Sequence, residues 1–294
     1  MTTVAFIGLG NMGSGMAANQ AKAGRQVLAF DLSPDAVARA VENGCVAATS
    51  AADAISRADI VLTMLPAGKH VCGLYEAEVL PNAKSGALLI DCSTIDVESA
   101  KTVANMCQEA GFNSADAPVS GGTAAADAGT LAFMVGCKEE NFTAVQEALE
   151  PMSKATLLAG SFGAGQAAKI CNNMLLAITM IGTCETFKMA EKLGLNAQNF
   201  FDISSQASGQ NWSMTSYCPV PGPVPAAPSN RDYQPGFAGA MMLKDLKLAL
   251  ESAEASGANI PFGSHAAEMY QAFCNNGGDV KDFSLTSPPL SQKA

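Results

Sequence analysis

A glycine-rich turn near the start of the chain constrains the fold more than any other feature. It comprises Gly8, Leu9, Gly10, Asn11, Met12 and Gly13. The turn follows an apolar run at residues 4–7 and opens an alanine-rich stretch at residues 12–23. Glycines at this spacing permit a tight turn, a close approach of the backbone to a pyrophosphate, and close helix packing. The helix start offers N–H groups and partial positive charge to phosphate. A strand, this turn and a helix in sequence predict a dinucleotide site, the alternative being a tight turn without a ligand.

An acidic residue closes the second predicted strand and indicates which dinucleotide fits. Asp31 can accept hydrogen bonds from ribose hydroxyls and would repel a 2′-phosphate. No arginine follows it in residues 32–34. The sequence therefore favours NAD over NADP. The alternative role for Asp31 is a helix cap, for which Ser33 is an equally good candidate.

The first half of the chain alternates strand and helix patterns. Strands are predicted at residues 4–7, 27–30, 59–66, 87–91, 113–118, 131–136 and 156–159. Repeated strand–helix–strand units predict a parallel, doubly wound sheet that binds ligands at the carboxyl ends of its strands.

The strand pattern stops near residue 162. Helices are predicted beyond it at residues 165–193, 197–207, 238–256 and 263–275. The predicted fold class is therefore α/β, with a Rossmann-type NAD-binding domain at residues 1–163. An all-helical domain with a long connecting helix follows at residues 164–294. A segment with five prolines at residues 219–228, preceded by Trp212, predicts a structured loop over the site.

The composition excludes several classes of partner. A net charge of −10 argues against nucleic acid, whose phosphates require a basic surface. Nine scattered cysteines without a CxxC motif indicate a reducing compartment, and two histidines make a histidine-based metal site unfavourable. No apolar run reaches the roughly 20 residues of a membrane span. With a strand at the N-terminus and no targeting segment ahead of it, the chain is expected in the cytoplasm.

A lone lysine at the edge of an apolar helix is the candidate proton-handling group. Lys169 and Asn173 are four residues apart and share a helix face, and no charged residue follows Lys169 until Glu185. The alternative is a surface lysine whose stem lies along an apolar face. Lysine is ordinarily protonated, with a pKa of about 10.4, and burial or a neighbouring cation lowers that value. A lysine so perturbed can act as a general base or acid.

A short polar turn is the candidate anion-binding loop. Ser120, Gly121 and Gly122 offer a hydroxyl and unhindered backbone N–H groups. The alternative is an ordinary turn, because serine and glycine are common turn residues.

Four segments together resemble the four signatures of the β-hydroxyacid dehydrogenase family. They are residues 8–13, 116–122, 165–173 and 244–246. Residues 209–212 and 233–237, around the proline-rich segment, resemble the 3-hydroxyisobutyrate dehydrogenase branch in particular. The order and spacing match along nearly the whole chain.

The resemblance implies a role for each matching residue. Lys169 matches the catalytic lysine and Asn173 the polar side chain beside it. Ser120, Gly121 and Gly122 match the loop that holds the substrate carboxylate. The cofactor-lining matches, besides the glycine turn and Asp31, are Leu65, Pro66, Thr94 and Lys244. For Lys244 the alternative is a solvated helix charge.

The resemblance also implies an activity, which is the NAD-dependent oxidation of 3-hydroxyisobutyrate to methylmalonate semialdehyde in valine breakdown, without a metal. Relatives acting on L-serine, or reducing tartronate or succinate semialdehyde, are the nearest alternatives. A silent nucleotide-binding module that senses redox state is an alternative of another class. A homodimer or homotetramer is expected. The chain after Leu285 departs from the family's pattern, which leaves its usual oligomer contact open.

Overall fold

The computed structural model describes residues 1–285, and the chain divides into two compact units, Met1–Lys169 and Ile170–Ala294. The division falls inside the long helix α9 (Ala164–Lys192), which begins in the first unit and continues into the second. The expected domain boundary at residues 163/164 lies at the start of this helix and stays a prediction. Residues 286–294, which include the atypical tail, lie outside the described residues.

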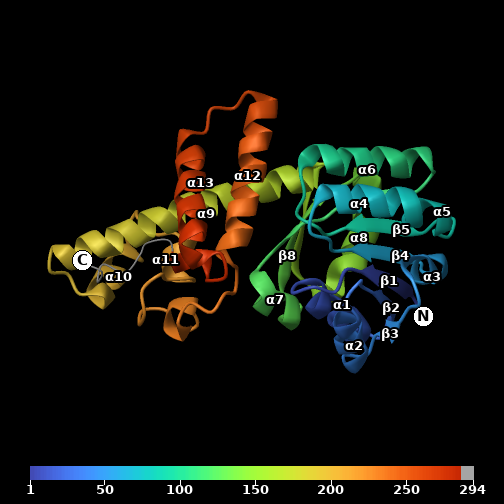
Figure 1. The fold of residues 1–294 in the computed structure, drawn as a ribbon, viewed down its shortest axis with the longest axis horizontal. Coiled ribbons are helices and arrows are strands. Elements are labelled where there is room, and N and C mark those ends of the chain that lie inside the picture. The colour runs from blue at the N-terminus through green and yellow to red at the C-terminus, as the bar shows by residue number, and fades with distance from the viewer. Residues whose placement is uncertain (286–294) are drawn as a thin grey trace. The chain divides into compact units, whose positions relative to one another are not determined.

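One nine-stranded sheet forms the centre of the first unit (Figure 1). Its strands are β1 (Thr3–Ile7), β2 (Gln26–Phe30), β3 (Val46–Ala47), β4 (Ile60–Thr63), β5 (Leu88–Asp91), β6 (Asn113–Asp116), β7 (Val119–Ser120), β8 (Leu131–Gly136) and β9 (Ser153–Gly160). The spatial order is β3-β2-β1-β4-β5-β6-β8-β7, and β9 pairs with β8. The order reverses between β1 and β4, which is the point at which doubly wound sheets bind ligands.

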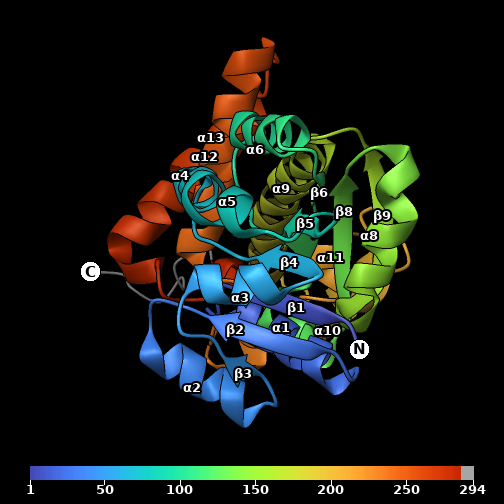
Figure 2. The same ribbon diagram turned by 90° about the vertical axis from the view of Figure 1, so that its right-hand side faces the viewer.

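Helices cover both faces of this sheet, as Figures 1 and 2 show. The helices of the first unit are α1 (Gly13–Lys22), α2 (Pro34–Glu42), α3 (Ala51–Arg57), α4 (Gly68–Leu74), α5 (Leu80–Asn82), α6 (Val97–Glu109), α7 (Gly122–Ala128) and α8 (Phe142–Leu149), with short helical turns η1 (Tyr75–Val79), η2 (Glu139–Asn141) and η3 (Glu150–Met152).

Alternation along the strands explains the two layers. In β1, Val4 and Phe6 join the cluster formed with α1, α2 and α8, whereas Ala5 and Ile7 join the cluster formed with α3, α4 and α6. Successive side chains of a strand point to opposite faces, so a strand buried on both sides is apolar throughout. The expected Rossmann-type α/β fold is confirmed.

One part of the sheet differs from the predicted parallel arrangement. Strands β3, β2, β1, β4, β5 and β6 are parallel, but β8 runs antiparallel to β6 and β7. Only the seven-residue helix α7 and a turn at Gly129 join β7 to β8. A parallel return requires a crossover of a dozen or more residues, so this short connection reverses the chain instead. The two-residue strands β3 and β7 were not predicted.

The second unit is helical. After α9 it contains α10 (Ala197–Ser204), α11 (Trp212–Thr215), α12 (Gly239–Ser256) and α13 (Pro261–Phe273), with turns η4 (Pro228–Arg231), η5 (Cys274–Gly278) and η6 (Phe283–Leu285). Its core is formed by α9, α12 and α13, including Met180, Leu246 and Tyr270. Helix α13 begins two residues before its predicted start because Pro261 is favoured at the first helical position.

Helix α9 explains the apolar run of the second half. Of the helices in the part of the chain that the structure describes, it alone is long and apolar enough to cross a membrane, with a mean hydropathy of 1.3. The uncharged run inside this helix, residues 170–184, is shorter than the roughly 20 residues of a membrane span, because Lys169 and Glu185 bound it. Of its most apolar window, 44% is buried within the protein.

Candidate functional site

The carboxyl edge of the parallel strands gathers the predicted cofactor residues of the first unit. The glycine turn follows β1, Asp31 follows β2, Leu65 and Pro66 follow β4, and Thr94 follows β5. These four strands are neighbours in the order β2-β1-β4-β5 and are parallel, so their carboxyl ends lie at one edge. Segments far apart in the sequence therefore meet at the switch point of the sheet.

The three glycines of the turn are required for different physical reasons. Gly8 has a φ of 98°, and a Cβ on Gly13 would lie 2.0 Å from the Gly8 carbonyl oxygen. Both are therefore required by the fold itself. A Cβ on Gly10 would meet no described atom within 4 Å, and its φ is not positive. Packing does not explain Gly10, whereas a ligand approaching the backbone does.

The start of α1 suits an anion. No side chain of the described residues caps it, and its first turn contains no acidic residue. The first N–H groups of a helix have no partner within the helix and carry partial positive charge. Together with the open side of Gly10, this arrangement fits the pyrophosphate of a dinucleotide.

Asp31 ties the glycine turn to the second strand and is not the cap of α2. Its Oδ2 accepts a hydrogen bond from the Leu9 N–H at 2.6 Å, and its Oδ1 accepts one from the Ser33 N–H at 2.8 Å. The cap of α2 is Ser33, whose side chain accepts from the Ala36 N–H. Each carboxylate oxygen has a further lone pair, so Asp31 retains acceptors for ribose hydroxyls.

The loops after β4 and β5 are bound to each other. The Leu65 N–H donates to Ser93 Oγ at 2.8 Å, and that hydroxyl donates to Asp91 Oδ1 at 2.6 Å. Thr63 Oγ1 also donates to Asp91 Oδ1, at 2.7 Å. The network fixes the residues that directly precede the predicted Pro66 and Thr94.

Two buried side chains hold the first turn of α9. Asp116, at the end of β6, accepts from the Gly163 N–H at 2.7 Å and the Gln166 N–H at 2.9 Å. Gln166 in turn donates from Nε2 to the Ser93 carbonyl at 2.8 Å and accepts at Oε1 from the Ile95 N–H at 3.1 Å. Neither residue was predicted to belong to the site from the sequence. Both lie within the motif segments, but their partners are distant in sequence.

Lys169 lies in the second turn of the same helix and is only 7% exposed. The alternative of a surface lysine with a solvated amine does not fit this burial. A buried lysine side chain is rare and occurs mainly at functional sites.

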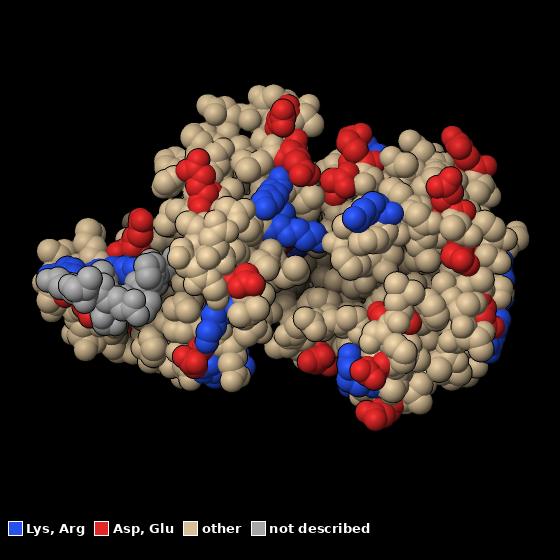
Figure 3. All heavy atoms as spheres, viewed as in Figure 1, with Lys and Arg blue, Asp and Glu red and all other residues tan. Residues whose placement is uncertain are grey.

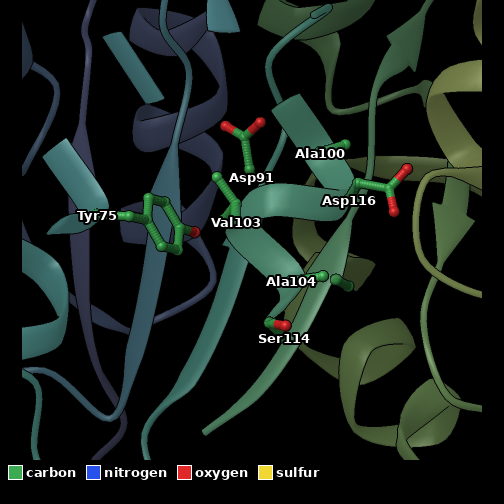
Figure 4. Close-up of a pocket in the computed structure, with 8 residues that line it drawn as sticks. Tyr75, Asp91, Ala100, Val103, Ala104, Ser114 and Asp116 are labelled. Carbon is green, nitrogen blue, oxygen red and sulfur yellow. The ribbon is translucent and has the colours of Figure 1, made fainter. Parts of the chain in front are cut away.

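A small cavity lies beneath this edge, among Tyr75, Asp91, Ser114 and Asp116 (Figure 4). Its volume of about 10 Å³ admits one water molecule, so it is not a substrate pocket. Figure 4 shows the Asp116 carboxyl group pointing away from Tyr75. Burial raises the pKa of Asp116 to about 6, a rise to which the nearby Asp91 contributes, while the N–H groups of Gly163 and Gln166 oppose it.

The predicted carboxylate loop joins β7 to α7. Ser120 ends β7, and Gly121 and Gly122 have φ values of 139° and 71°. A side chain rarely adopts such values, and a Cβ on Gly121 would lie 2.5 Å from the Ala125 Cβ. The loop therefore requires its glycines and leaves their N–H groups unhindered by side chains.

In the second unit, the predicted Asn173 lies against α12. Its Nδ2 donates to Asp245 Oδ2, and its Oδ1 accepts from Asn172 Nδ2 at 2.9 Å. Asn173 is 2% and Asp245 is 4% exposed, while the adjacent Lys244 is half-buried. Within this unit, the structure thus brings together residues of two of the motif segments.

A buried aspartate binds residues on both sides of the proline-rich segment. Asp282 accepts from Tyr217 Oη at 2.8 Å and from the Gly236 N–H at 2.9 Å, and its other oxygen accepts from Ser284 Oγ at 2.7 Å. Trp212 stacks on Tyr217 with ring centroids 5.0 Å apart. Within the segment, the Val224 carbonyl accepts from Asn230 Nδ2 at 2.9 Å and the Pro219 carbonyl accepts from Tyr233 Oη at 2.8 Å. The segment is therefore a structured loop, and its predicted place over the site stays a prediction.

Charge is dispersed on the face shown in Figure 3. Acidic and basic side chains are interspersed there among uncharged residues. The net charge of −10 is thus not gathered in one patch on this face.

Two family models match the chain. The NAD-binding domain of 6-phosphogluconate dehydrogenase matches residues 3–181. The NAD-binding region of NADP-dependent 3-hydroxyisobutyrate dehydrogenase matches residues 163–288.

Relatives match over the full length. A probable 3-hydroxyisobutyrate dehydrogenase of Mycobacterium tuberculosis is 47% identical over 294 residues, covering 100% of this chain and 99% of the relative. An NAD-dependent L-serine dehydrogenase of Pseudomonas aeruginosa is 45% identical, covering 97% and 96%. The solved structure of M. tuberculosis 3-hydroxyisobutyrate dehydrogenase with L-serine has a TM-score of 0.93 at 47% identity, covering 97% of this chain and 98% of that one.

Proposed function

The chain belongs to the β-hydroxyacid dehydrogenase family, in its 3-hydroxyisobutyrate dehydrogenase branch, and on that premise we propose that it oxidises 3-hydroxyisobutyrate to methylmalonate semialdehyde with NAD. The main support for the proposal is the burial of Lys169. This lysine lies on a helix whose first turn is bound to the edge of the sheet that also bears the glycine turn and Asp31.

The residues of the site fit the dinucleotide. The glycine turn and the uncapped start of α1 would hold the pyrophosphate, and Asp31 would hold the ribose. NAD⁺, when bound, supplies the acceptor for the hydride that leaves the carbinol carbon. The carboxylate of Asp31 opposes a 2′-phosphate, which supports NAD over NADP.

Lys169 moves the proton in this proposal. In oxidation its amine accepts the proton of the substrate hydroxyl, and in aldehyde reduction its ammonium returns that proton. Ser120 and the N–H groups of Gly121 and Gly122 bind the substrate carboxylate. Asn173, one turn beyond Lys169 on α9, orients the reacting oxygen without adding charge.

A panel of substrates tests the proposal. Both enantiomers of 3-hydroxyisobutyrate, L-serine and glycerate would be assayed with NAD⁺ and with NADP⁺. The highest kcat/KM is expected for 3-hydroxyisobutyrate with NAD⁺. An equal or higher kcat/KM for L-serine would favour the second candidate, an L-serine dehydrogenase, which the similarity to the P. aeruginosa enzyme supports.

We also propose that the protein is cytoplasmic and forms a homodimer or homotetramer. All nine cysteines are free thiols in the structure, as expected in a reducing compartment. Cell fractionation tests the location, and light scattering coupled to gel filtration tests the oligomer.

A further inference from the structure

The start of α9 is fixed by side chains from elsewhere in the first unit. The first N–H groups of a helix need partners from outside the helix. Here Asp116, 5% exposed, supplies both acceptors for the N–H groups of Gly163 and Gln166. It reaches them from 47 and 50 residues earlier in the chain, so the cap links α9 to the end of β6.

The start of α9 packs so closely against the sheet that two glycines at the contact have no room for a side chain. A Cβ on Gly165 would lie 2.4 Å from the Met134 carbonyl oxygen, and one on Gly136 would lie 2.3 Å from Asp116 Oδ1. The backbone of the first turn therefore packs directly against β6 and β8. A small shift of the helix start in this direction is sterically excluded.

Gln166 connects that helix start to the loop after β5. The side chain is fully buried and uses both ends of its amide, one on the Ser93 carbonyl and one on the Ile95 N–H. These two peptide groups flank Thr94, a predicted cofactor residue. A single side chain thus determines where the Thr94 backbone lies relative to α9.

Lys169 follows Gln166 by three residues. Residues at this spacing are neighbours on a helix surface, about 4.5 Å apart along the axis. The Gln166 side chain therefore sets the distance between the Thr94 loop and the backbone that carries the lysine. We propose that Gln166, supported by Asp116, is a positioning residue that holds Lys169 in register with the nicotinamide side of the cofactor site. The inference rests on the proposed function.

A purely structural role is the competing explanation, because any buried amide must be hydrogen-bonded. The chain offers a matched control in Gln20, which is also fully buried. Gln20 Nε2 donates to the Ala148 carbonyl at 2.9 Å, and its Oε1 accepts from Arg25 Nη1 at 2.8 Å. Neither contact involves a predicted site residue.

The test compares Gln166→Met with Gln20→Met. Methionine keeps the length of the side chain and removes both hydrogen bonds. Both variants should lose thermal stability to a similar degree. Gln166→Met should lower kcat about 100-fold, since a displacement of about 1 Å has that effect on a positioned reaction. NAD⁺ affinity by calorimetry should change by less than about threefold, and Gln20→Met should keep the wild-type kcat.

A second variant, Asp116→Asn, and a second measurement, the labelling of Lys169, distinguish a positioning role from a purely structural one. Asp116→Asn retains one acceptor and should lower kcat about tenfold if the helix start shifts part of the way. In the cofactor-free protein, acetic anhydride labelling of Lys169 would be followed against pH by mass spectrometry. The midpoint should move in Gln166→Met and not in Gln20→Met.

Two results would overturn the inference. One is a kcat for both Gln166→Met and Asp116→Asn that matches Gln20→Met. The other is a Lys169 labelling midpoint that is the same in all proteins. A wild-type protein without turnover on any hydroxy acid would overturn the proposed function instead, and the labelling experiment would then decide the positioning role by itself.

Discussion

Gly10→Ala separates what the glycine turn does for the fold from what it does for a ligand. A methyl group at position 10 projects into space that no described atom occupies within 4 Å, and the backbone there has no positive φ. Alanine is compatible with such a site. The free energy of unfolding should therefore stay the same or rise by about 0.4–1 kcal/mol, because the unfolded chain loses freedom.

The affinity for NAD⁺, unlike the stability of the protein, should fall in Gly10→Ala. If the pyrophosphate approaches the backbone at Gly10, a methyl group displaces it from at least one N–H donor. A hydrogen bond to a charged group contributes about 1.5–3 kcal/mol. The dissociation constant for NAD⁺ should accordingly rise about 10- to 100-fold.

Gly13→Ala is the matched control, because its methyl group would lie 2.0 Å from the Gly8 carbonyl oxygen. That variant should lose about 1–3 kcal/mol of stability or more by overpacking. Calorimetric titration with NAD⁺ and urea unfolding would be measured on both variants. Wild-type NAD⁺ affinity in Gly10→Ala would refute the reasoning, since the open side of the turn would then not face phosphate.

Three further predictions concern buried or loop aspartates. Asp31→Ser should lower the ratio of kcat/KM for NAD⁺ over NADP⁺ at least about tenfold, because like charges side by side cost several kcal/mol. Asp116→Asn should remove a pH dependence, because burial raises the pKa of Asp116 from 3.8 to about 6. The wild type should therefore lose about 2 kcal/mol of unfolding free energy relative to the variant as pH rises from 4 to 7. A constant difference across that range, measured by urea unfolding, would contradict it. Asp282→Ala should destabilise the protein by about 3 kcal/mol or more, because the Tyr217 hydroxyl and the Gly236 N–H lose their acceptor; an unchanged melting temperature would show that water replaces it.

Local sequence patterns predicted the elements but not their partners. Apolar runs bounded by turn residues indicated β1, β2, β4 and β5, and the spacing of helical patterns indicated α9 within a residue of each end. Local patterns do not predict the direction of a strand, because direction depends on the length of the connection to the preceding strand. The reversal at β8 follows from the short α7 connection, which periodicity does not report.

The site shows the same limit. Gly8, Gly10, Gly13 and Asp31 form a motif whose spacing itself describes the geometry, so their place at the sheet edge was predictable. Asp116 and Gln166 look like an acid at a strand end and a polar residue in a helix. Their function depends on partners in other segments, and one sequence contains no signal for such pairs.

In the proposed function, Lys169 transfers the proton in an NAD-dependent oxidation of 3-hydroxyisobutyrate. The most direct measurement is steady-state oxidation by the wild type and by Lys169→Ala, with NAD⁺ affinity measured in parallel. Lys169→Ala should lose about 10²- to 10⁴-fold in kcat and keep the wild-type NAD⁺ dissociation constant. A variant that keeps wild-type kcat, or a wild type that binds NAD⁺ without oxidising any hydroxy acid, would contradict it, the latter favouring a nucleotide-sensing module.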